Sequence, residues 1–214
     1  MDWEWISSNT VEIGGLLGDH VYLAIVPIVA GLVVALVVGA LGVRFPRLYP
    51  PIVALSSTFY TIPSLALFVI MPGLIGTQIL DPINVIIALT IYSASLLVRN
   101  VMDGLRATSP EVRQSALSMG YTPIRQLWEI DLPIAMPLVF AGLRVATVAN
   151  ISMVSVGALI GVGGLGELFT QGFQRRFYTP LLVGLVLSVL LALLADALLV
   201  LLQRWLTPWA RLVR

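Results

Sequence analysis

Long apolar stretches are the feature of this sequence that most restricts its fold. The run from Tyr22 to Val43 is apolar throughout, apart from Pro27 and its glycines. At about 1.5 Å per residue, a helix of this length crosses the roughly 30 Å hydrocarbon core of a bilayer. Four further stretches are predicted to be spans of the same kind, at about residues 52–71, 83–98, 134–158 and 181–202.

The composition indicates the same class of protein. Of the 214 residues, 58% are hydrophobic and only 11% are charged, which lies outside the usual range for a soluble domain. We therefore predict an all-α integral membrane protein, with about five transmembrane helices in a single domain over residues 1–214. The lipid bilayer is its expected surroundings.

Several function classes are excluded by what the chain lacks. A net charge of +1 gives no electrostatic basis for binding nucleic acid. The chain has no cysteine and a single histidine, His20, so we expect no metal site and no catalytic set. No ATP-binding motif is present, and we predict neither a cofactor nor an enzyme. Residues 1–20 are predicted to form a polar tail or short interfacial helix, with His20 exposed on its surface.

A polar hairpin at residues 110–133 interrupts the apolar chain. Ser109-Pro110-Glu111 is typical of a helix start, and Gly120 suits the left-handed residue that ends a helix. Thr122-Pro123 repeats the start signal, and Pro133 is expected to end the second helix near Asp131. The pattern predicts two short helices around a glycine elbow. Small side chains four residues apart, at Ala116 and Gly120, predict a docking face on the first helix.

The spacing within this hairpin resembles the coupling-loop signature of permease subunits of binding-protein-dependent ABC importers. The matching positions are Ser115-Ala116, Gly120, Ile130 and Leu132-Pro133, while Gln114 stands where the family has glutamate. The resemblance implies that the hairpin lies in a groove of a cytoplasmic ATPase subunit and transmits its closure to the membrane helices. A hydrogen bond from Gln114 could replace a salt bridge made by the family's acid. The alternative is a solvated amphipathic hairpin between two spans.

Three further runs resemble the osmoprotectant branch of these permeases, which imports glycine betaine, choline and carnitine. They are residues 61–68, 96–100 and 160–166. The implied protein is a bacterial inner-membrane permease that works as a dimer with a second copy or a paralogue. Two cytoplasmic ATP-binding subunits and an extracytoplasmic substrate-binding protein would complete the importer. A methionine-type importer is the alternative within the family, and a channel or scaffold without an ATPase is the alternative outside it.

Two polar patterns are candidates for the translocation path. Ser57, Thr61 and Ser64 recur at helical spacing in the second span and are predicted to line a water-filled path or a helix interface. Alternatively, their hydroxyls bond their own backbone carbonyls. The glycine segment at residues 157–166 is too glycine-rich for a comfortable helix and too apolar for a solvated loop. We predict a buried gate or close helix contact here, with Gly163, Gly164 and Gly166 as its main positions.

Charged and polar side chains inside the last two spans form a third candidate. Arg144 and Asn150 lie in the fourth predicted span, and Asp196 lies in the fifth. Counted along helices rising about 1.5 Å per residue, Arg144 and Asp196 lie at the same depth. An unpaired charge in hydrocarbon is costly, so the two are predicted to form an ion pair. The alternatives are that each lines an aqueous path separately, or that Arg144 extends to the interface.

The distribution of arginines predicts the orientation of the chain. With five spans, nine arginines fall on one side, against Arg175 and Arg176 on the other. Because cytoplasmic loops carry an excess of basic residues, the richer side is predicted to be cytoplasmic. The hairpin and the C-terminus would then lie inside, and the N-terminus outside. The nine are Arg44, Arg47, Arg99, Arg106, Arg113, Arg125, Arg204, Arg211 and Arg214.

Overall fold

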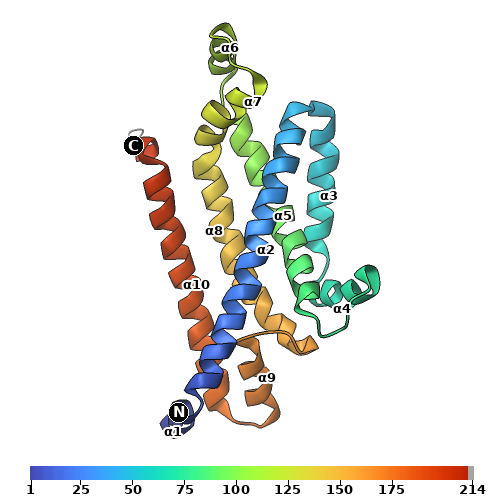
Figure 1. The fold of residues 1–214 in the computed structure, drawn as a ribbon, viewed down its shortest axis with the longest axis vertical. Coiled ribbons are helices and arrows are strands. Elements are labelled where there is room, and N and C mark those ends of the chain that lie inside the picture. Colours follow the sequence, from blue (N-terminus) through green and yellow to red (C-terminus); the bar gives the residue numbers. More distant parts are fainter. Residues whose placement is uncertain (212–214) are drawn as a thin grey trace.

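The computed structural model describes residues 1–211, and this part of the chain is helical without any strand. It forms an elongated bundle with a hairpin at one end and the N-terminus at the other (Figure 1). Four of its helices are long and apolar enough to cross a membrane, or up to five elements if a bent helix pair counts as one span. The predicted all-α membrane fold is confirmed. The four helices are α2 (Thr10–Arg44), α5 (Pro82–Arg106), α8 (Leu132–Gly157), preceded by the hairpin, and α10 (Tyr178–Leu206).

Shorter elements connect and extend these helices. The bent pair is α3 and α4, and the hairpin consists of α6, α7 and a π-helical turn that leads directly into α8. Their bounds are α1 (Trp3–Ser8), η1 (Pro46–Leu48), α3 (Tyr49–Thr61), α4 (Ser64–Ile75), α6 (Pro110–Ser118), α7 (Pro123–Gln126), η2 (Leu127–Asp131), η3 (Ala158–Ile160), α9 (Gly166–Gln174) and η4 (Pro208–Arg211).

Helix α5 is the centre of the bundle, with α2, α8 and α3 packed around it (Figure 1). Leu97, Val101 and Leu105 of α5 are buried in the core near the hairpin end. The contact with α2 is close because α2 carries glycine there. A Cβ on Gly31 would lie 2.5 Å from the Cβ of Ser93, so any larger residue would push the two helices apart.

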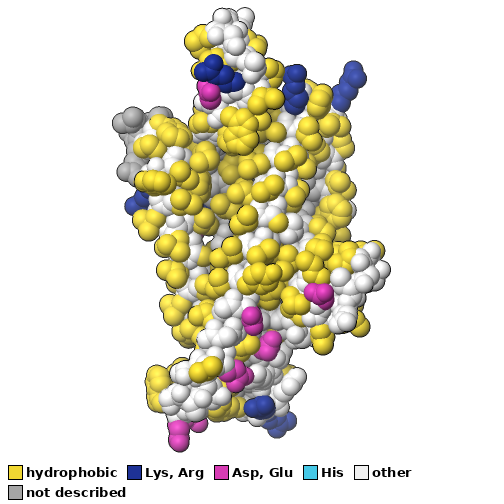
Figure 2. Space-filling view, viewed as in Figure 1, with side chains coloured by type: hydrophobic (Ala, Val, Ile, Leu, Met, Phe, Trp, Pro, Cys, Tyr) yellow, Lys and Arg dark blue, Asp and Glu magenta, His cyan; other side chains and the backbone are white. Residues whose placement is uncertain are grey.

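The outer surface is apolar over most of its length, and the charges gather at the two ends. Figure 2 shows hydrophobic side chains covering the middle of the visible face, with arginines at the hairpin end and most acidic side chains toward the N-terminal end. Helix α10 contributes much of this surface, and its Leu190, Leu193 and Leu194 are exposed. In a membrane protein such a surface is compatible with contact to lipid or to another apolar helix.

The N-terminal region differs from the prediction. Helix α2 begins at Thr10, so residues 10–20 are not a polar tail but the first three turns of a 35-residue helix. At about 1.5 Å per residue this helix is about 50 Å long and extends beyond the hydrocarbon core. His20 is consequently in the helix interior, where it is 0% exposed. The prediction of a surface histidine is wrong, because neighbouring segments cover this part of α2.

The second predicted span is broken rather than straight. Helices α3 and α4 meet at an angle of 102°. Ile62 is extended, with φ −66° and ψ 129°, because the ring of Pro63 disfavours helical geometry in the residue before it. Thr61 therefore ends one helix and Ser64 begins the next. The predicted stripe of hydroxyls along a single helix face does not exist.

Two helix boundaries near this break also differ. The loop expected from Met71 is helical, because α4 continues through Pro72 to Ile75 and ends at Gly76, whose φ is +74°. Such a left-handed glycine is a common helix end. Helix α5 does not end near Arg99 and Asn100 but continues to Arg106. The bundle is therefore longer at the hairpin end than the apolar run alone indicated.

Pro133 does not end the second hairpin helix. The chain passes from α7 through η2 into α8, and the N–H of Leu132 bonds to the carbonyl of Leu127 five residues earlier. This wider π turn accommodates a proline that would otherwise clash with the carbonyl four residues before it. The prediction of a separate second helix is wrong, since the hairpin joins a transmembrane helix without a break.

Candidate functional site

The turn of the hairpin has a well-defined geometry. Helix α6 begins with Ser109, whose side chain accepts a hydrogen bond from the N–H of Val112, and Pro110 follows at the first helical position. It ends in a Schellman motif, in which the N–H of Tyr121 bonds to the carbonyl of Ala116. Gly120 is left-handed with φ +82°, as predicted. The sequence signals therefore fix the elbow at this residue.

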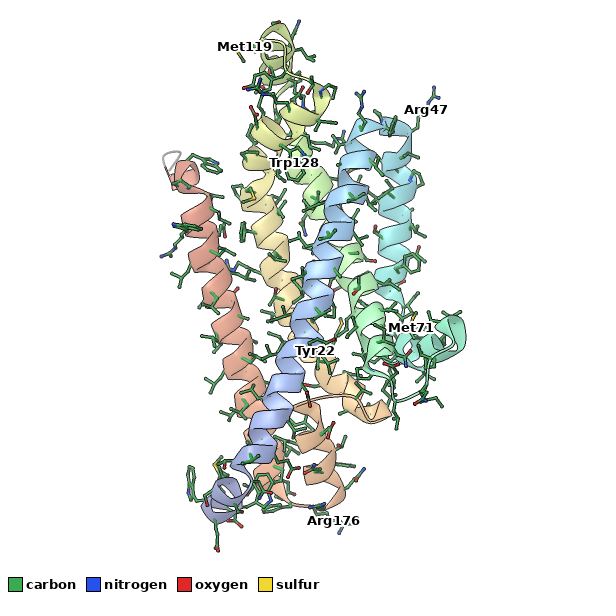
Figure 3. The ribbon with its side chains drawn as sticks, viewed as in Figure 1. Tyr22, Arg47, Met71, Met119, Trp128 and Arg176 are labelled. Carbon is green, nitrogen blue, oxygen red and sulfur yellow. The ribbon has the colours of Figure 1, made fainter. Side chains whose placement is uncertain are left out.

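The hairpin presents an apolar surface at its tip. Four large apolar side chains are exposed there, and Met119 lies at the extreme end of the molecule with Trp128 nearer the bundle (Figure 3). Ala116, by contrast, is only 1% exposed. The predicted docking face of Ala116 and Gly120 is therefore incorrect for Ala116. We call the exposed surface the hairpin tip; its residues are Leu117, Met119, Ile124 and Trp128.

A buried acid anchors the hairpin to the bundle. Asp131 is buried in the π turn, where it lies 3.4 Å from the Nη2 of Arg113 and accepts a hydrogen bond from Gln126. The same Nη2 donates to the carbonyl of Leu105 at the end of α5, at 2.7 Å. Arg113 thus ties α6 to both α5 and the base of α8. Sequence reasoning missed this pair, because the two residues lie in separate elements of the hairpin.

The remaining signature residues occupy different environments. Gln114 and Ser115 are exposed on α6, while Ile130 and Leu132-Pro133 are half-buried where the hairpin joins α8. Glu111 lies at the start of α6. Hydrogen bonds from its own backbone N–H and from the side chain of Ser109 lower the pKa of Glu111, so its carboxyl group stays charged at neutral pH. The exposed positions thus lie on the surface of α6, and the half-buried ones lie where the hairpin enters α8.

The predicted ion pair between Arg144 and Asp196 is confirmed. The guanidinium of Arg144 on α8 bonds both carboxylate oxygens of Asp196 on α10, with Nε–Oδ1 at 2.6 Å and Nη2–Oδ2 at 2.8 Å. Two parallel hydrogen bonds of this kind are the strong form of an ion pair. Both side chains are partly exposed within the chain. The pair connects α10 to the rest of the bundle.

A small cavity lies beside Asn150 between α3, α5 and α8. Its volume is about 10 Å³, and Tyr60, Tyr92 and Ser93 are among the residues that line it. The two tyrosine rings meet edge to face with centroids 6.1 Å apart. Asn150 and Ser93 are buried, and the Nδ2 of Asn150 and the Oγ of Ser93 lack a hydrogen-bond partner among the described residues. These two polar atoms are therefore buried beside the cavity without a partner among the described residues.

The three hydroxyl residues of the second span are separated by the break at Pro63. Ser57 and Thr61 are exposed on α3, and Ser64 is half-buried at the start of α4. Thr61 donates its hydroxyl to the carbonyl of Thr58 at 2.7 Å. For Thr61, backbone bonding is therefore what the structure shows.

The glycine segment is buried where backbones approach closely, as predicted. A Cβ on Gly163 would overlap the backbone of Ala158, and one on Gly166 would lie 2.5 Å from the carbonyl oxygen of Ser155. Gly164 is left-handed with φ +47°, and its Cβ would lie 2.7 Å from the backbone nitrogen of His20. This contact covers the histidine, whose Nε2 donates to the carbonyl of Ile151 at 2.9 Å.

These candidates occupy three levels of the molecule. The hairpin is at one end, Arg144, Asn150 and Asp196 are in the membrane helices, and the glycine segment is at the opposite end beside α9 (Figure 1). They do not converge on one catalytic or metal centre, and the described residues hold no cluster of three metal-ligating side chains.

Comparison with known proteins finds similarity over nearly the whole length of this chain. Residues 28–208 match the family described as binding-protein-dependent transport system inner membrane component. The osmoprotectant import permease protein OsmW of Salmonella typhimurium is 32% identical over 207 residues, covering 95% of this chain and 96% of the relative. The choline transport system permease protein OpuBB of Bacillus subtilis is 28% identical, covering 96% of this chain and 93% of the relative.

Two further comparisons concern a fused relative and a solved structure. The ergothioneine transport permease/ergothioneine binding protein EgtU of Helicobacter pylori is 34% identical over 137 residues, which are 64% of this chain and 24% of the relative. The fold is similar to a chain of the MetNI methionine ABC transporter in an inward-facing conformation. That match has a TM-score of 0.83 and 25% identity, and it covers 97% of this chain and all of the other.

The ion pair can be tested by exchanging its charges. Arg144→Asp and Asp196→Arg should each reduce the amount of folded protein in membranes at least about ten-fold, because each leaves two like charges facing one another in an apolar setting. The double exchange should recover part of that loss. Size-exclusion chromatography of detergent-extracted protein measures it. A double variant no better than the worse single one would show that the pair does not hold α10 in place.

The close packing of the glycine segment gives a second prediction. Gly163→Val should lower the melting temperature of the purified protein by several degrees, because its added carbons have no space beside Ala158. Gly14→Val, at a helical glycine with nothing within 4 Å, is the matched control and should have a small effect. Equal shifts in melting temperature for the two variants would mean that the glycine segment adjusts to the added carbons as an ordinary loop does.

Proposed function

The chain belongs to the family of binding-protein-dependent transport system inner membrane components, and we propose that it forms the path by which an ABC importer takes up a compatible solute such as glycine betaine, choline or carnitine. The main support for this class of solute is the 32% identity to an osmoprotectant import permease over 95% of this chain. The choline permease of Bacillus subtilis agrees with it.

The energy for transport comes from a separate subunit in this proposal. Permease subunits of this family work with ATP-binding subunits and a substrate-binding protein, and this chain contains no ATP-binding motif. One relative has a name that joins a permease and a binding protein in one chain. We infer a complex of two permeases, this chain with a second copy or a paralogue, two ATPases and a binding protein.

The hairpin tip is the proposed contact with the ATPase. Leu117, Met119 and Ile124 are exposed at the end of the molecule, beside Gln114, Ser115 and Gly120. An apolar surface that projects beyond the membrane helices is typical of a protein interface. The half-buried Ile130 and Leu132-Pro133 would pass the movement of the hairpin into α8, because α7, η2 and α8 form one continuous helix.

The proposed orientation places the hairpin and the C-terminus in the cytoplasm and the N-terminus outside the inner membrane. In Figure 2 arginines lie at the hairpin end, whereas the other end carries most of the acidic side chains together with a smaller group of basic ones. The positive-inside rule favours this orientation. Arg214 lies outside the described residues. The glycine segment would then face the binding protein's side of the membrane.

The path is proposed to follow α3, α5 and α8 between these ends. Asn150 and Ser93 have free polar atoms beside Tyr60 and Tyr92, and aromatic faces attract quaternary ammonium groups. In the present arrangement the cavity there is too small for a solute, so the helices that line it must separate to open the path. The remaining proposed path positions are Ser57, Thr61, Ser64, Arg144, Asp196, Gly163, Gly164 and Gly166.

A methionine importer is the second candidate, favoured by the TM-score of 0.83 to MetNI. Uptake of radiolabelled glycine betaine, choline and methionine separates the two. The test uses cells that lack other uptake systems and express this chain with its neighbouring ATPase and binding protein. We expect ATP-dependent uptake of betaine or choline and none of methionine. Uptake of methionine alone would overturn the proposed cargo, and solute flux through the purified chain alone would indicate a channel.

The coupling role of the hairpin gives a third prediction. Gly120→Trp should reduce co-purification of the ATPase at least about ten-fold, because a bulky side chain at the elbow prevents close docking. Gly120→Asn is the matched control, because asparagine tolerates a φ of +82° and adds little bulk. Both variants should remain in the membrane. Undiminished co-purification with Gly120→Trp would exclude the elbow from the contact.

A further inference from the structure

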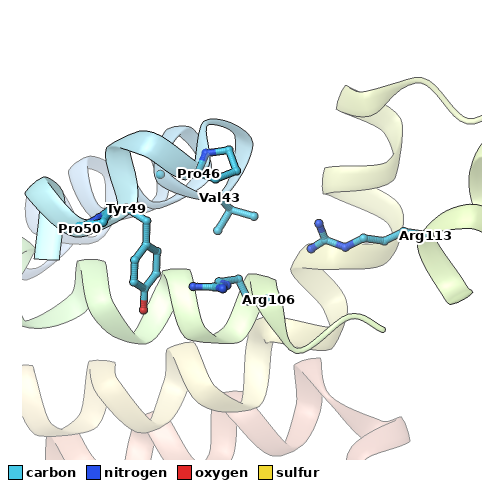
Figure 4. A pocket seen from close by; sticks show the side chains of 7 residues that line it. Val43, Pro46, Tyr49, Pro50, Arg106 and Arg113 are labelled. Atoms are coloured by element: carbon cyan, nitrogen blue, oxygen red, sulfur yellow. The ribbon is translucent and has the colours of Figure 1, made fainter. Parts of the chain in front are cut away.

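A cavity of about 260 Å³ lies between the hairpin and the turn that joins α2 to α3. Its walls are largely apolar, formed by Gly42, Val43, Pro46 and Pro50 at the ends of these helices. Tyr49, Arg106 and Arg113 complete it, and the two arginines come from different helices, α5 and α6. In Figure 4 the guanidinium of Arg113 is directed toward Val43, and that of Arg106 is directed toward the ring of Tyr49. The cavity therefore combines an apolar wall with two cationic groups.

The two arginines have unused hydrogen-bonding capacity. The guanidinium of Arg106 lies 4.5 Å from the ring centroid of Tyr49, and it forms no salt bridge with a described carboxylate. The Nε of Arg113 is buried without a partner, although its Nη2 donates to the Leu105 carbonyl and lies 3.4 Å from the Oδ1 of Asp131 in an ion pair. Asp131 balances one of the two charges. One positive charge and several N–H donors therefore remain for an anion.

We propose that this cavity binds the headgroup of an acidic phospholipid. Guanidinium groups bind phosphate oxygens through paired hydrogen bonds, and Tyr49 already holds Arg106 in position. The cavity lies where the apolar run of α2 ends at Arg44, which is the level at which headgroups meet acyl chains. Its apolar walls fit the glycerol and upper acyl carbons of a lipid. A free phosphate ion has no group that would cover them.

A bound headgroup would also act on the hairpin. Arg113 connects α6 to the end of α5 through the Leu105 carbonyl, and Arg106 lies at the end of α5 against the ring of Tyr49 on α3. A phosphate held by both arginines would add a second link between the hairpin and α5 and, through Tyr49, a link to α3. Lipid binding at this site does not depend on which solute the protein carries. Its failure would leave the proposed transport function intact.

Native mass spectrometry of the purified full-length chain tests the site. The protein is titrated with phosphatidylglycerol or with phosphatidylcholine of the same acyl chains. We expect the wild-type chain to retain phosphatidylglycerol preferentially, and Arg106→Gln to reduce this preference about five-fold. Arg47→Gln is the matched control, because Arg47 is at the same end but points away from the bundle (Figure 3) and does not line the cavity. It should retain the wild-type preference.

Two further measurements distinguish a specific lipid site from misfolding and from simple anion binding. Val43→Phe fills the cavity without changing any charge, so it should lower phosphatidylglycerol retention even if Arg106→Gln folds poorly. Inorganic phosphate at millimolar concentration should not displace the lipid. The proposal is overturned if Arg47→Gln weakens binding as much as Arg106→Gln, which would indicate diffuse surface charge. It is also overturned if phosphate alone displaces the lipid, which would indicate a simple anion site.

Discussion

The absence of hydrogen-bond partners in lipid is the constraint on which this structure depends. Every N–H and carbonyl within the membrane must be satisfied by the chain itself, which leaves helices as the elements that can span it. Three of the places where the chain departs from a straight helix show how backbone groups are satisfied there. After the break at Pro63 its carbonyl accepts from the N–H of Leu67, in the π turn the N–H of Leu132 bonds to the carbonyl of Leu127, and in the glycine segment the N–H of Val162 bonds to the carbonyl of Gly157.

Charged groups follow the same constraint. Arg144 and Asp196 lie within the transmembrane helices, and they satisfy one another through two short hydrogen bonds. Helix α10 packs against α8 and α9, but none of its residues beyond Gly184 is fully buried. Lipid is as apolar as these side chains, so it gives α10 no hydrophobic reason to pack inward. The ion pair therefore provides a directional contact between α8 and α10, where the burial of apolar side chains contributes little stabilisation.

The sequence predicted features that depend on local chemistry or on depth alone. The spans follow from apolar length, the elbow at Gly120 from capping signals, and the ion pair from counting residues along two helices. The wrong predictions concern features that depend on neighbours. The burial of His20 requires the glycine segment to lie over it, and Pro133 continues a helix because a π turn precedes it. Ala116 is buried, although its small size and spacing had predicted an exposed docking position. The apolar side chains exposed at the tip, such as Met119, were not predicted, because the hairpin as a whole is polar.

The hairpin is held at both of its ends, and this determines how it can move. On one side it continues through η2 into α8, and on the other Arg113 attaches α6 to the carbonyl of Leu105 on α5. Helix α5 is the most buried helix among the described residues, so the hairpin is attached to a close-packed part of the bundle. The tip projects from this fixed base without packing against other helices. In the proposed complex, a force on the tip would therefore pass into α8 through the π turn, which is the wider and less regular part of an otherwise continuous helix. The same helix carries Arg144 and Asn150, which places the polar groups of the membrane interior on the element that a partner at the tip would move.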